Sequence, residues 1–235
     1  MPIIHESMWG RKLVVFFVVD TSASMEGAKI AALNNAVEET FSIIRDISKH
    51  NNDCKIEIAV LQFSSGVQWM YPNSISAEEF LWKTLIADGL ADFGAACNEL
   101  ASKLTIKSGG FMQNSYGTYS PVFILLSDGQ PTDSYEIPLK KLKENPWFRY
   151  GVKIAIAISD NADVNVLEEF TGSRDTVLPI QQIEALKYCF SFVEIDWYIV
   201  DDDEIKQKQV AEQINANIQS GIIIPATEGN SIDDD

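Results

Sequence analysis

Most of the chain alternates between short apolar runs and longer amphipathic stretches. Residues 13–19 (LVVFFVV) are apolar without interruption, which predicts a strand buried on both faces of a sheet. Residues 55–63 (KIEIAVLQF) alternate first and then become apolar, which predicts a second strand. Between them, the three- and four-residue spacing of apolar side chains over residues 27–49 predicts a helix with one buried face; these are Ile30, Leu33, Val37, Phe41, Ile44 and Ile47.

A hairpin and a helix-start pattern follow the second predicted strand. Residues 64–66 (SSG) form a turn into residues 67–70, which places one antiparallel strand at the sheet edge. Ser76 and Glu79 then form a capping-box pattern, typical of a helix start, ahead of an apolar group made of Phe80, Leu81, Trp82 and Leu85.

The rest of this region and the second half of the chain continue the alternation of strands and helices. The expected elements are a loop at 87–93, a helix at 94–104, a polar surface loop at 105–120, a strand at 121–126, a helix after Asp133 with Pro138 in its first turn, a strand at 152–159, a helix at 164–170 ending at Gly172, a strand at 176–178 and a closing helix at 181–193. This order predicts an α/β doubly wound fold: a mostly parallel, six-stranded sheet with one antiparallel edge strand and helices on both faces.

Composition narrows the possible partners. The formal net charge is −16 at pH 7, which disfavours binding to nucleic acid or to an anionic membrane. Solubility is the simplest meaning of this acidity, although basic partners or cations would also fit it. No apolar run approaches the roughly 20 residues of a membrane-spanning helix. Cys54, Cys97 and Cys189 show no metal or disulfide spacing, which predicts reduced thiols in a cytoplasmic protein.

Two acidic clusters directly follow apolar strands. Residues 20–24 (DTSAS) follow the first strand, and residues 127–129 (SDG) follow the strand at 121–126. Because the carboxyl ends of parallel strands meet at one edge of a sheet, both clusters should meet there. Carboxylate and hydroxyl oxygens form a hard ligand set, suited to Mg²⁺, Mn²⁺ or Ca²⁺.

These two clusters carry a resemblance to a known family. DTSAS matches the DxSxS motif of von Willebrand factor A domains, and SDGQPTD (residues 127–133) resembles the third metal-site segment of that family. The resemblance spans residues 11–195 and implies a Rossmann-like sheet with a metal-ion-dependent adhesion site (MIDAS) at its carboxyl edge. It implies that Asp20, Ser22 and Ser24 hold a divalent cation, most simply Mg²⁺, with Asp128 acting directly or through water.

The resemblance also implies a domain organisation. Residues 1–195 would form the von Willebrand A domain, and residues 196–235 an acidic C-terminal extension. The extension contains four acids at 201–204, followed by an amphipathic helical pattern that includes Ile205, Val210, Ile214 and Ile218. Acids at that position would favour the positive end of the helix.

The second motif of the family departs from its pattern in this chain. That motif places a threonine ligand in a loop written GGTxxG, whereas residues 88–94 are DGLADFG and Ala91 occupies the threonine position. A methyl group cannot coordinate an ion, so either water or the neighbouring Asp92 would have to complete the site. Asp92 is also explained as a solvated loop acid, and Asp133 resembles a helix cap more than a site residue. Ser22 and Ser24 could equally cap the following helix.

The leading functional hypothesis is a cytoplasmic protein-binding module that is not an enzyme. The segments SDGQPTD and TVLPI (residues 176–180) are most similar to bacterial stand-alone proteins of the TerY tellurite-resistance type. That resemblance implies metal-stress and phosphorylation signalling with kinase- or phosphatase-like partners. The alternatives are a metal-free scaffold with a degenerate site and a haloacid-dehalogenase-like enzyme with Asp20 as nucleophile. The latter chemistry needs a second acid two residues on, where this chain has Ser22.

Overall fold

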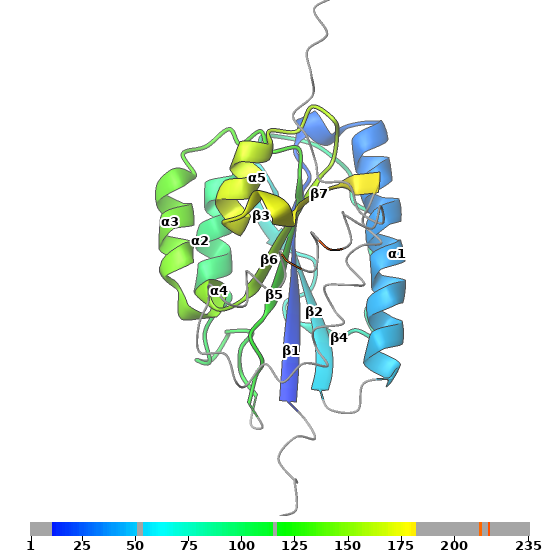
Figure 1. Ribbon diagram of the computed structural model, residues 1–235, viewed down its shortest axis with the longest axis vertical. Helices are drawn as coiled ribbons and strands as arrows, with labels where there is room; N and C mark the ends of the chain where they lie inside the picture. The colour runs from blue at the N-terminus through cyan, green and yellow to red at the C-terminus, as the bar shows by residue number, and fades with distance from the viewer. Residues whose placement is uncertain (1–10, 51–53, 115–116, 182–211, 213–215, 217–235) are drawn as a thin grey trace, which may run out of the picture.

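The core of the molecule is a seven-stranded sheet. The computed structural model describes residues 11–50, 54–114 and 117–181 and the single residues 212 and 216. Six strands follow the order β3-β2-β1-β5-β6-β7, and β4 also pairs with β2 (Figure 1). Their bounds are β1 (Arg11–Asp20), β2 (Cys54–Ser64), β3 (Gly66–Trp69), β4 (Ile75–Ser76), β5 (Val122–Ser127), β6 (Val152–Ala157) and β7 (Val177–Pro179).

The predicted fold class is confirmed. The strands β1, β2, β5, β6 and β7 run parallel, and β3 is antiparallel to β2 in the expected hairpin. The sheet gains one short strand, β4, which pairs antiparallel with Glu57 and Ile58 of β2. Since β1 pairs with β2 over residues 54–63, β3 and β4 occupy successive stretches of the opposite edge.

Helices cover both faces of the sheet, as expected. α1 (Ala28–His50) lies on one side in Figure 1, and the other side carries α2 (Phe93–Lys103), α3 (Glu136–Glu144), α4 (Pro146–Arg149) and α5 (Val164–Thr171). Alternate residues of β1 enter the two cores: Val15, Phe17 and Val19 pack on the α1 side, and Val14, Phe16 and Val18 on the other. The apolar run of β1 is therefore buried on both faces, for the reason that the sequence indicated.

Three predicted helices are found within one residue of their expected ends. α1, α2 and α5 correspond to the helices expected at 27–49, 94–104 and 164–170. Pro138 lies in the first turn of α3. Gly172 ends α5 in the left-handed conformation, with φ 85°, which suits glycine because it lacks a Cβ.

The predicted loop at 105–120 is only partly a surface loop. Its described residues contain no helix, but Phe111 and Met112 are buried. The ring of Phe111 stacks on Phe16 of β1 with a centroid distance of 6.1 Å. This loop therefore closes one end of the core beneath α2.

The prediction of a helix around residues 80–85 is wrong. The capping-box pattern gives a single turn, in which Phe80 N donates to Ser76 O, and residues 80–92 contain neither helix nor strand. Asn34 of α1 binds the backbone of Leu85 on both sides: its Nδ2 donates to the carbonyl (3.0 Å) and its Oδ1 accepts from the amide (2.8 Å). Asn34 Oδ1 also accepts from Trp82 Nε1 at 3.0 Å. These tertiary bonds replace the intrahelical ones.

Two predictions lie outside the described residues. They are the closing helix, of which residue 181 alone is described, and the acidic extension at 196–235 with its amphipathic helix, of which residues 212 and 216 alone are described. The described part of the chain holds no helix that is both long and apolar enough to cross a membrane.

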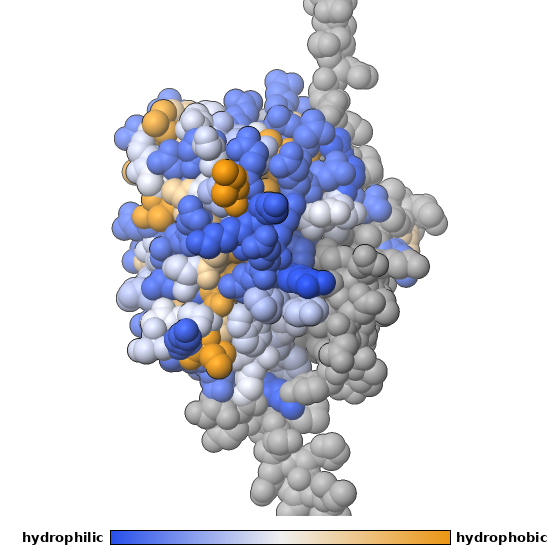
Figure 2. Space-filling model, turned by 90° about the vertical axis from the view of Figure 1, so that its left-hand side faces the viewer, coloured by the Kyte–Doolittle hydropathy of each residue, from blue (hydrophilic) through white to orange (hydrophobic). Residues whose placement is uncertain are grey.

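The surface over α2 and α3 is mostly hydrophilic. Figure 2 shows apolar side chains there as separate spots among polar residues. The most exposed large apolar side chains of the described residues are Leu81, Ile86, Leu90, Ile106 and Ile137. Isolated apolar residues are normal on a protein surface, so the separate spots over α2 and α3 by themselves indicate no binding site.

The clamp formed by Asn34 gives a stability prediction. Asn34→Ala removes the partners of Trp82 and of both backbone groups of Leu85, so we expect the free energy of unfolding to fall by about 2–4 kcal/mol. Chemical denaturation measures this change. Asn35→Ala is the matched control, because Asn35 is exposed on the same helix and carries the same change in helix propensity. Equal effects of the two substitutions would contradict the clamp.

Candidate metal centre

Backbone hydrogen bonds hold two loops together at the carboxyl edge of the sheet. Ala23 N, in the loop after β1, donates to Gly89 O at 3.0 Å. Asp88 N donates in return to Thr21 O at 2.8 Å. The DTSAS loop is therefore fixed against the loop that carries Ala91.

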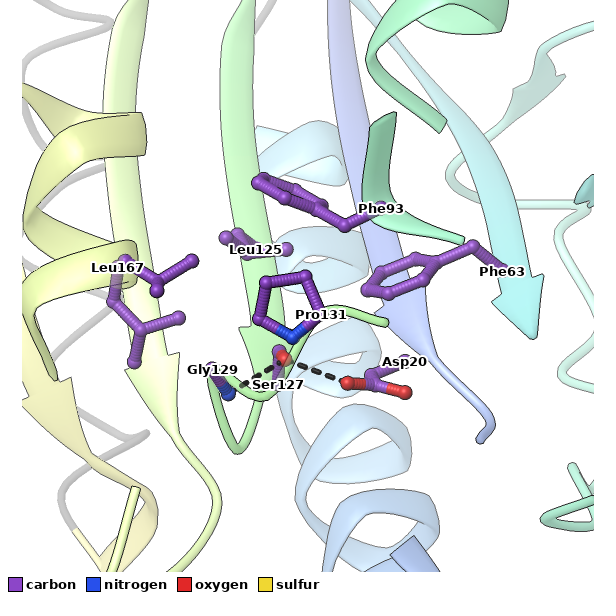
Figure 3. A pocket seen from close by; sticks show the side chains of 9 residues that line it. Asp20, Phe63, Phe93, Leu125, Ser127, Gly129, Pro131 and Leu167 are labelled. Carbon is purple, nitrogen blue, oxygen red and sulfur yellow. Dashed lines mark hydrogen bonds between the residues drawn. The ribbon is translucent and has the colours of Figure 1, made fainter. Parts of the chain in front are cut away.

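Asp20 ends β1 and collects hydrogen bonds from two loops. Its side chain is fully buried, and Oδ1 accepts from Ser22 N (3.0 Å) and Ser22 Oγ (2.6 Å). Its Oδ2 accepts from Ser127 Oγ at 2.6 Å, a contact visible in Figure 3. Since Ser22 gives its proton to Asp20, the 3.0 Å contact between the hydroxyls of Ser22 and Ser24 has Ser24 as donor. Ser24 is exposed, so its lone pairs face solvent.

Asp128 lies in the second loop and is fully buried. Its Oδ2 accepts from Lys29 Nζ of α1 at 2.9 Å, whereas its Oδ1 is buried without a hydrogen-bond partner. The backbone fixes this loop, because Asp163 N donates to Asp128 O at 2.8 Å. A Cβ at Gly129 (φ 71°) would lie 2.2 Å from Asp163 O, so glycine is required there.

Burial at this site disfavours the ionised form of the Asp20 carboxyl. Burial raises the pKa of the Asp20 carboxyl above its ordinary value of 3.8, and the charge of Asp128 adds to the rise. Hydrogen bonds from Ser127 and Ser22 lower this pKa but do not overcome burial. A cation at this edge would relieve the cost of keeping two carboxylates buried together.

The position that departs from the family motif is buried and hydrogen-bonded to a third loop. Ala91 N donates to Thr132 Oγ1 at 2.9 Å, and Thr132 N donates to Ala91 O at 2.9 Å. The side chain of Ala91 is 2% exposed and packs in the apolar core. The structure thus places a hydroxyl, from Thr132, next to the backbone of the residue where the family carries its threonine.

Asp92 and Asp133 both bind backbone amides. Asp92 Oδ2 accepts from Gly66 N, in the β2–β3 turn, at 2.7 Å, and its ligand role stays a prediction. Asp133 accepts from Gly94 N (2.9 Å) and Ala95 N (3.1 Å), so it caps the start of α2 from another loop. The sequence indicated a cap at Asp133, but it did not indicate which helix it serves.

The alternative role of Ser22 and Ser24 as helix caps finds no support in the geometry. Ser22 precedes the short 3₁₀ turn Ala23–Met25 without a side-chain capping bond, and both hydroxyls belong to the Asp20 network.

Sequence reasoning missed two residues that complete this arrangement. Ser127 was recognised only as part of its cluster, and Lys29 was not singled out. A signal for Lys29 was available: a lysine in the first turn of a helix is electrostatically unfavourable unless it has an anionic partner.

The cavity beneath the site is small. Figure 3 shows its lining. Asp20 and Ser127 supply the polar part, and apolar side chains that include Phe93, Leu125 and Leu167 supply the rest. Its volume is about 10 Å³, room for a single water molecule. A cavity of this size has no room for an organic ligand.

The residues present fit a hard divalent cation. The hydroxyls of Ser22 and Ser24 form one hydrogen-bonded network with the carboxylate of Asp20, and the charge of the buried Asp128 acts on Asp20. One buried oxygen of Asp128 lacks a hydrogen-bond partner. No cluster of three or more His, Cys, Asp or Glu side chains suited to a metal occurs among the described residues. A site here would therefore depend on serine hydroxyls as much as on carboxylates.

Comparison with known proteins identifies relatives of this fold. The family model for the von Willebrand factor type A domain matches residues 15–191. Among functionally curated proteins, none matches the chain.

Three solved structures illustrate the similarity. Proximal thread matrix protein 1 from the mussel byssus, with a zinc-occupied MIDAS motif, is 17% identical with a TM-score of 0.52, covering 77% of this chain and 47% of that one. A von Willebrand factor type A protein from Catenulispora acidiphila is 13% identical (TM-score 0.52; 87% and 43%). The open pilus adhesin SpaC from Lactobacillus rhamnosus GG is 14% identical (TM-score 0.53; 88% and 30%). The chain spans less than half of each of these proteins, and at such identities the likeness shows the fold alone.

The raised pKa of Asp20 gives a pH prediction. A raised folded-state pKa means that the folded protein binds its proton more tightly, so stability falls as pH rises from about 3.8 through the folded pKa. Without divalent ions at pH 7, Asp20→Asn removes the buried charge and should raise the thermal midpoint. The gain should vanish near pH 3.8 and below.

Thermal denaturation with a chelator, as a function of pH, measures this effect. Asp88→Asn, an exposed acid in the adjoining loop, should show no such pH-dependent gain. A lower midpoint for Asp20→Asn at pH 7 would mean that the hydrogen bonds to the carboxylate outweigh its burial.

Proposed function

Because the chain belongs to the family of von Willebrand factor type A domains, we propose that it is a protein-binding module or scaffold with a MIDAS-like divalent-cation site at the carboxyl edge of its sheet. Domains of this family commonly act in protein interaction. A cation held at that edge would supply positive charge for an acidic group of the partner protein.

One observation carries this proposal. Asp128 keeps a buried carboxylate oxygen without a hydrogen-bond partner, one residue after Ser127, whose hydroxyl donates to Asp20. Buried polar atoms are nearly always paired, so an orphaned carboxylate oxygen calls for a ligand. A cation between the two loops would satisfy it.

We assign the ligands by the resemblance and the geometry together. Asp20, Ser22 and Ser24 would hold the cation, and Asp128 would act directly or through water. Mg²⁺ suits this set best, since it keeps several waters and needs few protein carboxylates, while Ca²⁺ and Mn²⁺ remain candidates. Asp92 would join these ligands either through Oδ2, which already accepts from Gly66 N, or through Oδ1.

The surface beside the site offers apolar contact for the partner. Ile86 is 83% exposed and Leu90 is 58% exposed, and both lie in the segment fixed to the DTSAS loop. Exposed apolar side chains around a charged centre suit a protein partner better than a small ion alone.

A metal-free scaffold is the second candidate, and a specific observation favours it. Ala91 cannot coordinate an ion, and the ammonium of Lys29 already neutralises Asp128 at 2.9 Å. Partner binding would then use the same edge without a metal.

We propose no enzymatic activity. Haloacid-dehalogenase chemistry at Asp20 would need a second acid two residues on; that position is Ser22, whose hydroxyl donates to Asp20. Turnover of a generic phosphate ester that Asp20→Asn abolishes would overturn this view.

The finer assignment rests on sequence segments alone. SDGQPTD and TVLPI support a TerY-type role in metal-stress or phosphorylation signalling, with kinase- or phosphatase-like partners. Cys54 and Cys97 are both buried. We propose a cytoplasmic location for the protein, as the absence of any disulfide spacing among its cysteines suggests.

Removing an exposed ligand tests the metal site. Ser24→Ala should weaken Mg²⁺ binding by about tenfold or more, because it deletes one proposed ligand without disturbing the core. Isothermal titration calorimetry measures the Kd. Ser42→Ala, at an exposed position of α1, is the control. Partner binding that Asp20→Ala leaves unchanged would exclude the metal-mediated version of the function.

Restoring the family threonine tests the effect of the departure at position 91. Ala91→Thr adds a hydroxyl and should strengthen cation binding in the same titration, if the site is only weakened. Ala28→Thr, exposed at the start of α1, is the control for adding a threonine. No gain from a folded Ala91→Thr protein would point to a deeper loss of the site.

A further inference from the structure

Lys29 reaches from α1 into the proposed site. It is the second residue of the helix, and its Nζ donates to Asp128 Oδ2 at 2.9 Å. The side chain of Lys29 is 28% exposed, whereas that of Asp128 is 0% exposed. A partly solvated cation thus pairs with a fully buried anion.

The position of Lys29 on its helix has an electrostatic cost. The first turn of α1 carries no acidic residue, and the positive end of the helix disfavours a cation there. The ion pair with Asp128 offsets this cost, which explains how a lysine is accommodated in the first turn of α1.

The site also needs a positive charge. Asp20 and Asp128 are both fully buried. Asp20 is the last residue of β1, and Asp128 directly follows β5, the strand that pairs with β1. Within the described part of the chain, no cation other than Lys29 forms an ion pair with either carboxylate. Two buried carboxylates close together are costly unless a cation compensates them.

We propose that Lys29 is the internal counter-cation of this centre, and that a divalent ion must displace its ammonium from Asp128 to bind there. The inference rests on the proposed metal-dependent function. It adds that Lys29 determines how tightly the site binds the cation. In the metal-free protein the ammonium holds Asp128. In the metal-bound protein Lys29 turns toward solvent, which its partial exposure permits.

The physical basis is competition between two cations for one carboxylate. A divalent ion and an ammonium a few ångströms apart repel each other beside the buried carboxylates, where water screens charges less than in bulk solution. The metal must also replace a charge-assisted hydrogen bond, which is stronger than a neutral one. Both effects lower the affinity of the wild-type site and keep it folded without metal.

Cation titration of a lysine variant tests the displacement. Lys29→Met keeps the aliphatic stem and removes the charge, so Mg²⁺ and Mn²⁺ should bind on the order of tenfold tighter or more, measured by isothermal titration calorimetry. Lys49→Met is the matched control, because it removes the same charge from the exposed last turn of the same helix. Its Kd should stay that of the wild type.

A double-mutant cycle without metal tests the pairing itself. In the presence of a chelator, Lys29→Met should lower the thermal midpoint by about 3–6 °C, because it leaves Asp128 charged and unpaired. In the Asp128→Asn background the same substitution should no longer destabilise the protein, because Lys29 there has lost its anionic partner and stays at the positive end of the helix. Equal effects in the two backgrounds would overturn the ion pair as the source of stability.

The outcomes separate this inference from the proposed function. If the wild type binds the cation and Lys29→Met binds it equally or more weakly, the displacement is overturned and the metal-dependent function stands. If Lys29→Met binds and the wild type does not, the inference holds and the metal-dependent function fails. If neither binds, both are overturned.

Discussion

Two carboxylates, Asp20 and Asp128, are buried side by side at the end of the central strands, and much of the surrounding architecture compensates their charge. Asp20 accepts from Ser22 and Ser127, and Asp128 accepts from Lys29. The parallel pairing of β1 with β5 brings these groups together, because both strands end at the same edge. Burying anions is costly in any protein, and this cost supports the proposed cation site at this edge of the sheet.

The loops around this pair hold one another in place. Thr132 and Ala91 exchange hydrogen bonds, and Asp133 caps the start of α2. Gly129 packs against the backbone of Asp163, where no side chain fits. A partner would therefore meet a preformed edge, which lowers the entropic cost of binding.

The fold was largely predictable from the sequence, whereas the site was only partly so. The apolar run of β1 and the helical spacing of α1 are local signals, and both elements form where expected. The failed helix at residues 80–85 shows the limit: its local pattern was right, but Asn34 of α1 captures Leu85 and Trp82 instead. Lys29 likewise gains its role only from Asp128, 99 residues away in the chain. Such long-range bonds leave little trace in a local pattern.

The hydrogen bond between Ser127 and Asp20 also constrains how the protein acquires its site. The two residues are 107 positions apart, and β5 pairs with β1 only after the intervening chain has been placed. Contacts of such sequence separation form late and slow folding, because loop closure must precede the gain. During synthesis Asp20 and Ser22 emerge long before Ser127, so the charged end of β1 lacks its distant partner until β5 has left the ribosome. A product that stops before β5 would carry the DTSAS motif without Ser127 and Asp128.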